Sequence, residues 1–183
     1  LARMQRLFFA LEMPEPVRQA LLRIKAPVAG ARWQSDAQLH LTLLFLGNVP
    51  EEAVPDISLA LRGLSLPRFD LDVGGLGCFG QPETPRNLWA GVTPEAPLIA
   101  LQATLKQCLA HLGFSLEKRP FRPHITLARF KKQPGSVQSL LAEHGQDDFG
   151  AVPVRDFVLL RSTQGAKGSD YTVVERFPLT ESP

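Results

Sequence analysis

The sequence predicts an α+β protein of two pseudo-symmetric lobes, each a largely antiparallel sheet with helices on its outer face, that enclose a central cleft. Three observations predict this fold class. Strand-like and helix-like hydrophobic patterns alternate along the 183 residues. The order strand, helix, strand, helix, strand occurs twice. The middle strand of each half carries a nearly identical tetrapeptide, HLTL in the first and HITL in the second.

The first half contains three predicted strands and two predicted helices. The strands are rich in aliphatic and aromatic residues or alternate apolar with charged ones, and they span Arg6–Glu12, Leu39–Leu46 and Phe69–Val73. A first helix is expected behind Pro14 and Pro16, because proline suits the first turn of a helix. A second helix is expected over Glu51–Leu64, where apolar residues recur at helical spacing.

A stretch rich in glycine and proline, Gly74–Arg86, is predicted to be a loop that divides the halves. Four further strands are expected, over Asn87–Thr93, Pro123–Phe130, Val154–Leu160 and Tyr171–Phe177. Two helices are expected, one from near Pro97 to Gly113 and a short one from Ser136 to His144, and a polar loop over Ser162–Asp170. We therefore expect one domain over residues 1–183, with lobe one at roughly 1–80 and lobe two at roughly 81–183. Exchange of strands between the lobes is left open.

The composition is typical of a globular domain, with 44% hydrophobic and 21% charged residues. No apolar run approaches the roughly 18–20 residues of a membrane span, so we expect no membrane association. The N-terminus lacks the pattern of a secretory signal. Two cysteines, Cys78 and Cys108, are too few for a disulfide framework, and a cytoplasmic location is expected. Since the net charge is only +2, an anionic ligand must be held by local charges.

Each tetrapeptide places a histidine and a threonine on the same face of its strand. Because side chains alternate along a strand, His40 and Thr42 point the same way, and so do His124 and Thr126. Two facing lobes would bring both pairs to one cleft. Such a set suits in-line displacement at phosphorus: a neutral imidazole removes a proton from the attacking oxygen, and a protonated one donates to the leaving oxygen. The hydroxyls can hydrogen-bond the non-bridging oxygens.

Other classes of site find less support. A catalytic zinc site uses three or four ligands, and no acidic residue accompanies either histidine motif at ligand spacing, so we expect no metal and no cofactor. His111 and His144 have no partner motif and are interpreted as surface or capping residues. The glycines of Gly74–Gly77 lack the following helix start that a phosphate-binding loop requires.

The HLTL and HITL motifs resemble those of the two-histidine (2H) phosphoesterase superfamily. More narrowly, the chain is similar to the RNA 2′,3′-cyclic phosphodiesterases, also called 2′-5′ RNA ligases. The similarity covers almost the whole chain, through RLFFAL at Arg6–Leu11, LHLTLLFLG, GLGCFG, NLWAGV and RPFRPHITLAR. The resemblance implies a metal-independent enzyme that hydrolyses a terminal RNA 2′,3′-cyclic phosphate to a 2′-phosphate, and that also joins such ends reversibly through a 2′-5′ bond. The implied partners are RNA ends of this kind, tRNA halves among them.

Carried over to this sequence, the resemblance makes His40, Thr42, His124 and Thr126 the catalytic set. As a hypothesis, His124 activates the water and His40 protonates the leaving oxygen. The near symmetry of the two motifs leaves the reverse assignment open.

The resemblance and strand alternation together predict five substrate-binding residues, Phe8, Arg122, Arg129, Lys167 and Tyr171. Phe8 is expected to face the cleft and stack on a base, because alternation assigns its neighbour to the core. Arg129 matches a basic position of the family, but strict alternation places it on the wrong face, so a β-bulge is required. Lys167 is expected to replace a basic residue that members often carry just before the tyrosine, where this chain has Asp170.

Two alternative functions stay open: a cyclic phosphodiesterase for small nucleotides or ADP-ribose derivatives, and a non-catalytic module that binds RNA ends. The basic stretch from Lys118 to Lys132 favours RNA. The presence of both histidines and both threonines favours catalysis, since binding alone does not require two titrating groups. A monomer is expected, because the two lobes bury their own faces.

Overall fold

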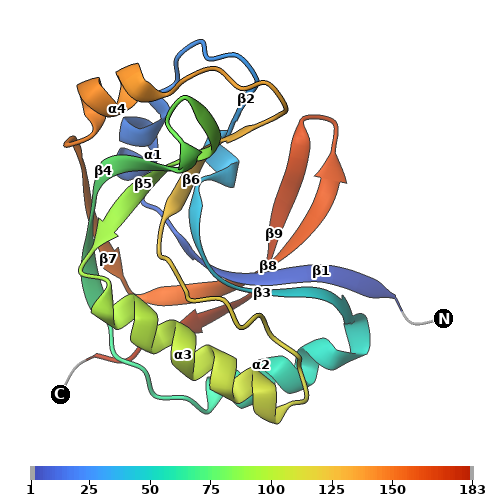
Figure 1. Ribbon diagram of the computed structural model, residues 1–183. Helices are drawn as coiled ribbons and strands as arrows, with labels where there is room; N and C mark the ends of the chain where they lie inside the picture. Colours follow the sequence, from blue (N-terminus) through green and yellow to red (C-terminus); the bar gives the residue numbers. More distant parts are fainter. Residues whose placement is uncertain (1–2, 182–183) are drawn as a thin grey trace.

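A computed structural model, which describes residues 3–181, confirms the predicted α+β class. Figure 1 shows a strongly curved sheet with helices packed around it. The strands are β1 Met4–Glu12, β2 Ala31–Trp33, β3 His40–Pro50, β4 Phe69–Gln81, β5 Thr84–Thr93, β6 Ile125–Phe130, β7 Asp148–Val154, β8 Asp156–Gly165 and β9 Gly168–Pro178. The α-helices are α1 Glu15–Leu22, α2 Val54–Arg62, α3 Ala96–His111 and α4 Gln138–His144. Two short 3₁₀-helices, η1 and η2, span Asp36–Gln38 and Glu51–Ala53.

The nine strands form a single sheet in the order β7-β4-β5-β6-β3-β1-β8-β9, with β2 paired to β6. All strand pairs are antiparallel. The two halves of the sheet meet where β3 pairs with β6 through a single register pair, Leu41 with Ile125. The HLTL and HITL tetrapeptides therefore lie side by side at the centre of the sheet.

Strands from the predicted lobes interleave. β4 pairs with β5 and β7, whereas β8 and β9, from the end of the chain, join β1 and β3 on the other side of the centre. The order of the strands in the sheet therefore differs from their order in the sequence. A division into lobes near residue 80 stays a prediction.

Burial separates the two faces of the sheet. Leu7, Phe9 and Leu11 of β1 lie fully in the main core, which the helices cover, whereas Phe8 and Ala10 belong to a small apolar cluster with Val158 and Leu160 of β8. The alternation of faces along a strand produces this division. Figure 1 shows α2 and α3 together along one side of the sheet, with α1 and α4 at its other end.

The stretch Gly74–Arg86, predicted as a loop, instead forms most of β4 and the start of β5. Its glycines serve β-bulges: the β4–β5 register shifts at Gly74/Leu76 and at Phe79/Gly80, and Gly75 and Gly80 have φ of +75° and +84°. Such φ values favour glycine, so these glycines allow the strand to bend. Their number makes the composition of the stretch resemble that of a loop.

Other boundaries also differ from the predictions. β3 continues to Pro50 through Gly47, at φ +76°, and the polar stretch Ser162–Asp170 forms the paired ends of β8 and β9. β7 was not predicted, because Gly150 and Pro153 interrupt its apolar pattern. An exposed hairpin and an edge strand need no continuous apolar face, so hydrophobic patterning does not reveal them.

Replacing Gly77 with alanine is expected to lower the free energy of unfolding by about 1–3 kcal/mol. A Cβ atom at Gly77 would lie 2.3 Å from the indole ring of Trp89, which also packs against Phe79 at a centroid distance of 5.7 Å. Urea denaturation measures the change. The control is Gly63→Ala at the end of α2, where the nearest atom would be at an ordinary 3.6 Å. Equal stabilities of the two variants would contradict this view of the β4–β5 packing.

Candidate active site

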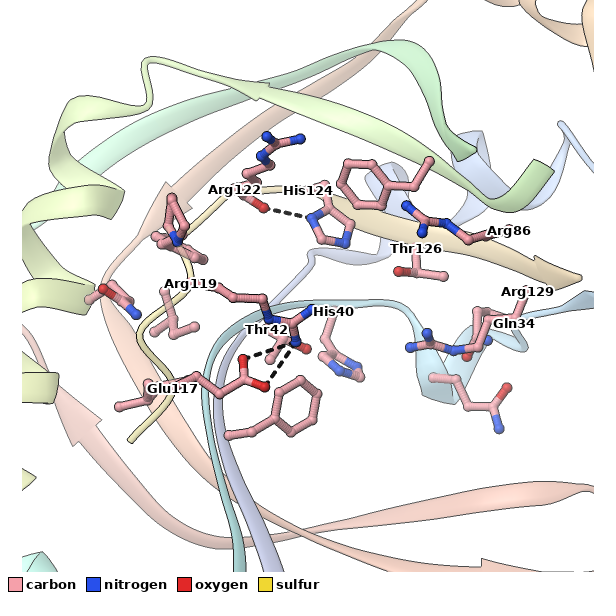
Figure 2. A pocket seen from close by; sticks show the side chains of 18 of the residues that line it. Gln34, His40, Thr42, Arg86, Glu117, Arg119, Arg122, His124, Thr126 and Arg129 are labelled. Atoms are coloured by element: carbon pink, nitrogen blue, oxygen red, sulfur yellow. Dashed lines mark hydrogen bonds and ion pairs between the residues drawn. The ribbon is translucent and has the colours of Figure 1, made fainter. Parts of the chain in front are cut away.

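A cavity of about 450 Å³ lies over the β3–β6 junction, and both histidine–threonine pairs line it. His40 and Thr42 come from β3, Thr126 comes from β6, and His124 immediately precedes β6. Figure 2 shows both imidazoles, with Thr42, Thr126 and Arg129, around one hollow. Because Leu41 opposes Ile125 in an antiparallel pair, each histidine lies across from the threonine of the other motif.

The intervening apolar residues explain why the polar ones face the cavity. Leu41, Leu43, Ile125 and Leu127 are at most 2% exposed and belong to the main core. Each buried aliphatic side chain of this size stabilises the fold by about 1.5–3 kcal/mol relative to exposure. A one-residue slip of either strand would expose these residues and bury the histidines, so the core fixes the orientation of the site.

The backbone two residues upstream orients each imidazole. Nδ1 of His124 lies 2.6 Å from the carbonyl oxygen of Arg122. Because a carbonyl only accepts, Nδ1 carries the hydrogen and Nε2 is left to exchange a proton. His40 has the equivalent backbone hydrogen bond to Gln38. The two motifs are thus anchored in the same way.

Aromatic rings hold both imidazoles from behind. The ring of His40 lies 4.9 Å from that of Tyr171 and 5.2 Å from that of Phe8, between centroids. The ring of His124 lies 5.1 Å from Phe79 and 6.3 Å from Trp89. Such packing restricts the rotamers of both catalytic candidates before any ligand binds.

Burial lowers the pKa of His40 from its ordinary 6.5 to about 4; the hydrogen bond to Gln38 opposes this shift, and the Arg129 guanidinium adds to it. The pKa of His124 is also lowered, first by burial and then by Arg129, against its hydrogen bond to Arg122. Both imidazoles are therefore neutral at pH 7 without a bound anion. A phosphate beside Arg129 would offset that positive charge and raise both pKa values.

Arg129 lines the cavity because β6 contains the bulge that its position requires. The neighbours Leu88 and Trp89 of β5 pair with Ala128 and Thr126, so Leu127 is an extra residue on β6. Leu127 and Ala128 are consequently both buried. The face alternation shifts by one residue, which returns Arg129 to the face of Thr126.

The structure separates the remaining predicted substrate-binding residues into two groups. Arg122 and Tyr171 line the cavity. Phe8 is only 3% exposed and contacts His40, so its ring supports the imidazole and is not free to stack on a base. Lys167 is exposed in the turn between β8 and β9 and does not line the cavity. The hairpin carries this lysine away from the catalytic strands.

Several cavity residues were not predicted from the sequence. Arg86 lies in the stretch predicted as a loop, and Arg119 forms an ion pair with Glu117 at 2.9 Å. Phe45 is 50% exposed and lines the cavity. Phe45 lies two residues after the HLTL motif, and this proximity is the only feature of the sequence that could have identified it. Arg86 and Arg119 belong to neither tetrapeptide motif.

The described part of the chain contains no group of three or more histidine, cysteine or acidic side chains arranged to hold a metal ion. Residues 3–181 also contain no helix with the length and apolar character of a membrane span. The cavity itself offers two proton-exchanging imidazoles, two hydroxyls and four arginines. These groups can bind a phosphoryl anion and move protons on both sides of the phosphorus.

Comparisons with known proteins agree with this geometry. The family model described as the 2'-5' RNA ligase superfamily matches residues 13–166. An RNA 2',3'-cyclic phosphodiesterase of Archaeoglobus fulgidus is 33% identical over 169 residues, which cover 91% of this chain and 96% of the relative. One of Thermus thermophilus is 39% identical over 186 residues, covering 95% and 90%. The solved structure of Escherichia coli LigT complexed with 3'-AMP has a TM-score of 0.79 at 29% identity, and the alignment covers 98% of this chain and 100% of the other.

The stability of the fold is expected to fall as the pH decreases from 6.5 towards 4. In this window the unfolded chain protonates His40 near pH 6.5, whereas the folded chain keeps it neutral down to about pH 4. Protons therefore favour the unfolded state, and the free energy of unfolding rises with pH across this interval. Denaturant titrations at several pH values measure the slope, which His40→Gln should flatten. An unchanged slope in His40→Gln, compared with the exposed control His111→Gln, would contradict the low pKa.

Proposed function

The chain belongs to the 2'-5' RNA ligase superfamily, and from this membership and the cavity we infer that it is an RNA 2′,3′-cyclic phosphodiesterase. The observation that carries the proposal is that two His-x-Thr pairs from adjacent strands line one cavity. Recognition of a phosphate requires donors, and acid–base catalysis requires two groups that exchange protons on opposite sides of the phosphorus. This site offers both.

The reaction is the opening of a cyclic phosphodiester by water. The water oxygen forms a bond to phosphorus as the bond from phosphorus to the 3′ oxygen breaks. One histidine accepts a proton from the water, and the other donates a proton to the 3′ oxygen. The products are a 2′-phosphate and a 3′-hydroxyl. A second protonation exchange through solvent returns the histidines to their starting states.

The other cavity groups stabilise the charge on phosphorus. The hydroxyls of Thr42 and Thr126 donate to the non-bridging oxygens, and Arg129 supplies the positive charge. Hydrogen bonds to a charged partner contribute about 1.5–3 kcal/mol each. The bound anion also raises the pKa of both histidines, so substrate binding favours uptake from solvent of the proton that the acid requires.

We assign the base to His124 and the acid to His40. The anchored Nδ1–H of His124 leaves Nε2 as a proton acceptor towards the cavity. Both imidazoles are anchored by a backbone hydrogen bond and packed against aromatic rings, so the sulfur substrate described below distinguishes this assignment from its reverse.

The proposed function extends to the RNA substrate, the oligomeric state and the cellular location of the enzyme. The RNA carries a terminal 2′,3′-cyclic phosphate, as tRNA halves do, and a 5′-hydroxyl replacing water gives reversible 2′-5′ ligation. One chain supplies both histidines, so a monomer suffices. A cytoplasmic enzyme fits Cys78 and Cys108, which are free thiols.

Incubation with a short RNA ending in a 2′,3′-cyclic phosphate, in EDTA, is expected to yield a 2′-phosphate, identified by phosphorus NMR. His40→Ala and His124→Ala should each lower kcat by about 10²–10⁴-fold, the typical contribution of one acid or base. His111→Ala, at the exposed end of α3, is the matched control. A 3′-phosphate product would reverse the leaving group, and turnover of cyclic mononucleotides without turnover of the RNA would favour the small-nucleotide alternative. Full turnover by both site variants would refute the proposal.

A substrate with sulfur in place of the 3′ bridging oxygen distinguishes the two histidines. A thiolate leaves without protonation, because thiol pKa values lie near 8.5. His40→Ala should therefore recover most of its lost rate on the sulfur substrate, while His124→Ala should not. Rescue of His124→Ala alone would show that the roles are exchanged.

A further inference from the structure

A second cavity, of about 400 Å³, lies at the end of β1 and β8 that is distal to the catalytic histidines. Its lining is strongly basic and polar and includes Arg3, Gln5, Arg6, Arg161, Ser162 and Thr163. Glu51 is the one acidic residue that lines it. Neither the proton transfers nor the phosphate contacts of the catalytic cavity use these residues.

The three arginines of this second cavity are free of partners within the fold. Among residues 3–181, no side-chain ion pair or hydrogen bond involves Arg3, Arg6 or Arg161. Other arginines of the fold are paired, such as Arg62 with Glu175. Arginine presents a fork of N–H donors that matches phosphate oxygens, so a cluster of unpaired guanidiniums favours a phosphate ligand.

A row of side chains on one sheet face connects this cavity to the catalytic one. Arg6 alternates with the core residue Leu7 and so shares the face of Phe8, whose ring contacts His40. Ser162 of β8 pairs with Arg6 on one side and with Tyr171 of β9 on the other. Tyr171 lines the catalytic cavity and packs against His40. The row Arg6, Ser162, Tyr171 thus runs from the second cavity to the active site.

The length of this row matches a short piece of single-stranded RNA. Neighbouring strands are about 4.8 Å apart, so Arg6 and Tyr171 lie roughly 10 Å apart across the sheet. Stacked nucleotides advance by about 3.4 Å each, so this is a distance of about three nucleotides. Since a cyclic phosphate is at the 3′ end, the chain that leaves the active site continues in the 5′ direction.

We propose that the second cavity binds backbone phosphates of the RNA, a few nucleotides to the 5′ side of the cyclic phosphate end. The proposal rests on the proposed function, because it takes the cyclic phosphate to be seated between His40 and His124. Arg6 binds the phosphate oxygens, and the hydroxyl of Ser162, on the same face, adds a hydrogen bond of the kind common at nucleic-acid backbones. Arg161 pairs with Leu7 and so lines the same cavity from the other face of the sheet, where it adds a second guanidinium. This site makes affinity depend on RNA length and on salt, without selecting a sequence.

The test is direct binding of fluorescent RNAs that end in a 3′-phosphate, measured by anisotropy over a series of salt concentrations. An octanucleotide and a dinucleotide with the same 3′ end are compared. The octanucleotide should bind the wild-type protein more tightly. In Arg6→Gln and Arg161→Gln this length-dependent gain should fall roughly tenfold, and the slope of log Kd against log salt should decrease by about 0.7 for each lost phosphate contact.

Arg23→Gln is the matched control, since Arg23 is an exposed arginine at the end of α1 outside both cavities. Equal length dependence in the Arg6 and Arg161 variants and in the wild type would overturn the proposal. Equal weakening of both RNAs would also overturn it, because the arginines would then act on the catalytic cavity. Inorganic phosphate that competes at this site without any effect of RNA length would identify a free-anion site instead. Turnover of a cyclic mononucleotide by the wild type tests the proposed function separately, since that ligand does not span the row.

Discussion

The contact between β3 and β6 is the constraint on which the site depends. A single register pair, Leu41 with Ile125, joins the two halves of the sheet, and both residues are fully buried. Their burial determines which face of each strand carries the histidines and threonines. Because the two strands are antiparallel, the same pair also sets each histidine across from the opposite threonine. Packing of apolar side chains on one face of the sheet thus determines how the histidines and threonines are arranged on the other face.

The protonation of the two histidines depends on whether an anionic ligand is bound. The aromatic surroundings that orient His40 and His124 also remove them from water, and Arg129 lies close enough to both to disfavour their charged forms. Without an anion, both imidazoles therefore have pKa values below the ordinary 6.5. In the proposed mechanism, a bound phosphate offsets the positive charge of Arg129, so protonation of the acid is coupled to binding of the substrate. Burial is the larger cause of both lowered pKa values, and Arg129 adds to it while it offers a positive charge to a phosphate.

Much of the fold could be predicted from hydrophobic periodicity, because long, half-buried elements such as β1, β3 and α3 have clear patterns. The predicted loop over Gly74–Arg86 was wrong, since glycines that serve bulges in β4 resemble loop glycines in a sequence. The position of Arg129 shows the same limit within the site. Alternation placed it on the wrong face, and only the extra residue Leu127, visible through its pairing with β5, returns it to the cavity.

The α+β class and the faces of the four motif residues could be predicted from the chain alone, because both follow from local alternation of polar and apolar residues, and the duplicated His-x-Thr motif is read directly from the residues. Tertiary structure decided which strands meet, since β8 and β9 join β1 across a long separation in sequence that no local pattern encodes. It also decided that Phe8 supports His40 and does not face a ligand, that Lys167 lies outside the cavity, and that Arg86 and Arg119 lie within it. These outcomes depend on strand order, bulges and the burial of each side chain by distant neighbours, and all three arise only when the whole sheet is assembled.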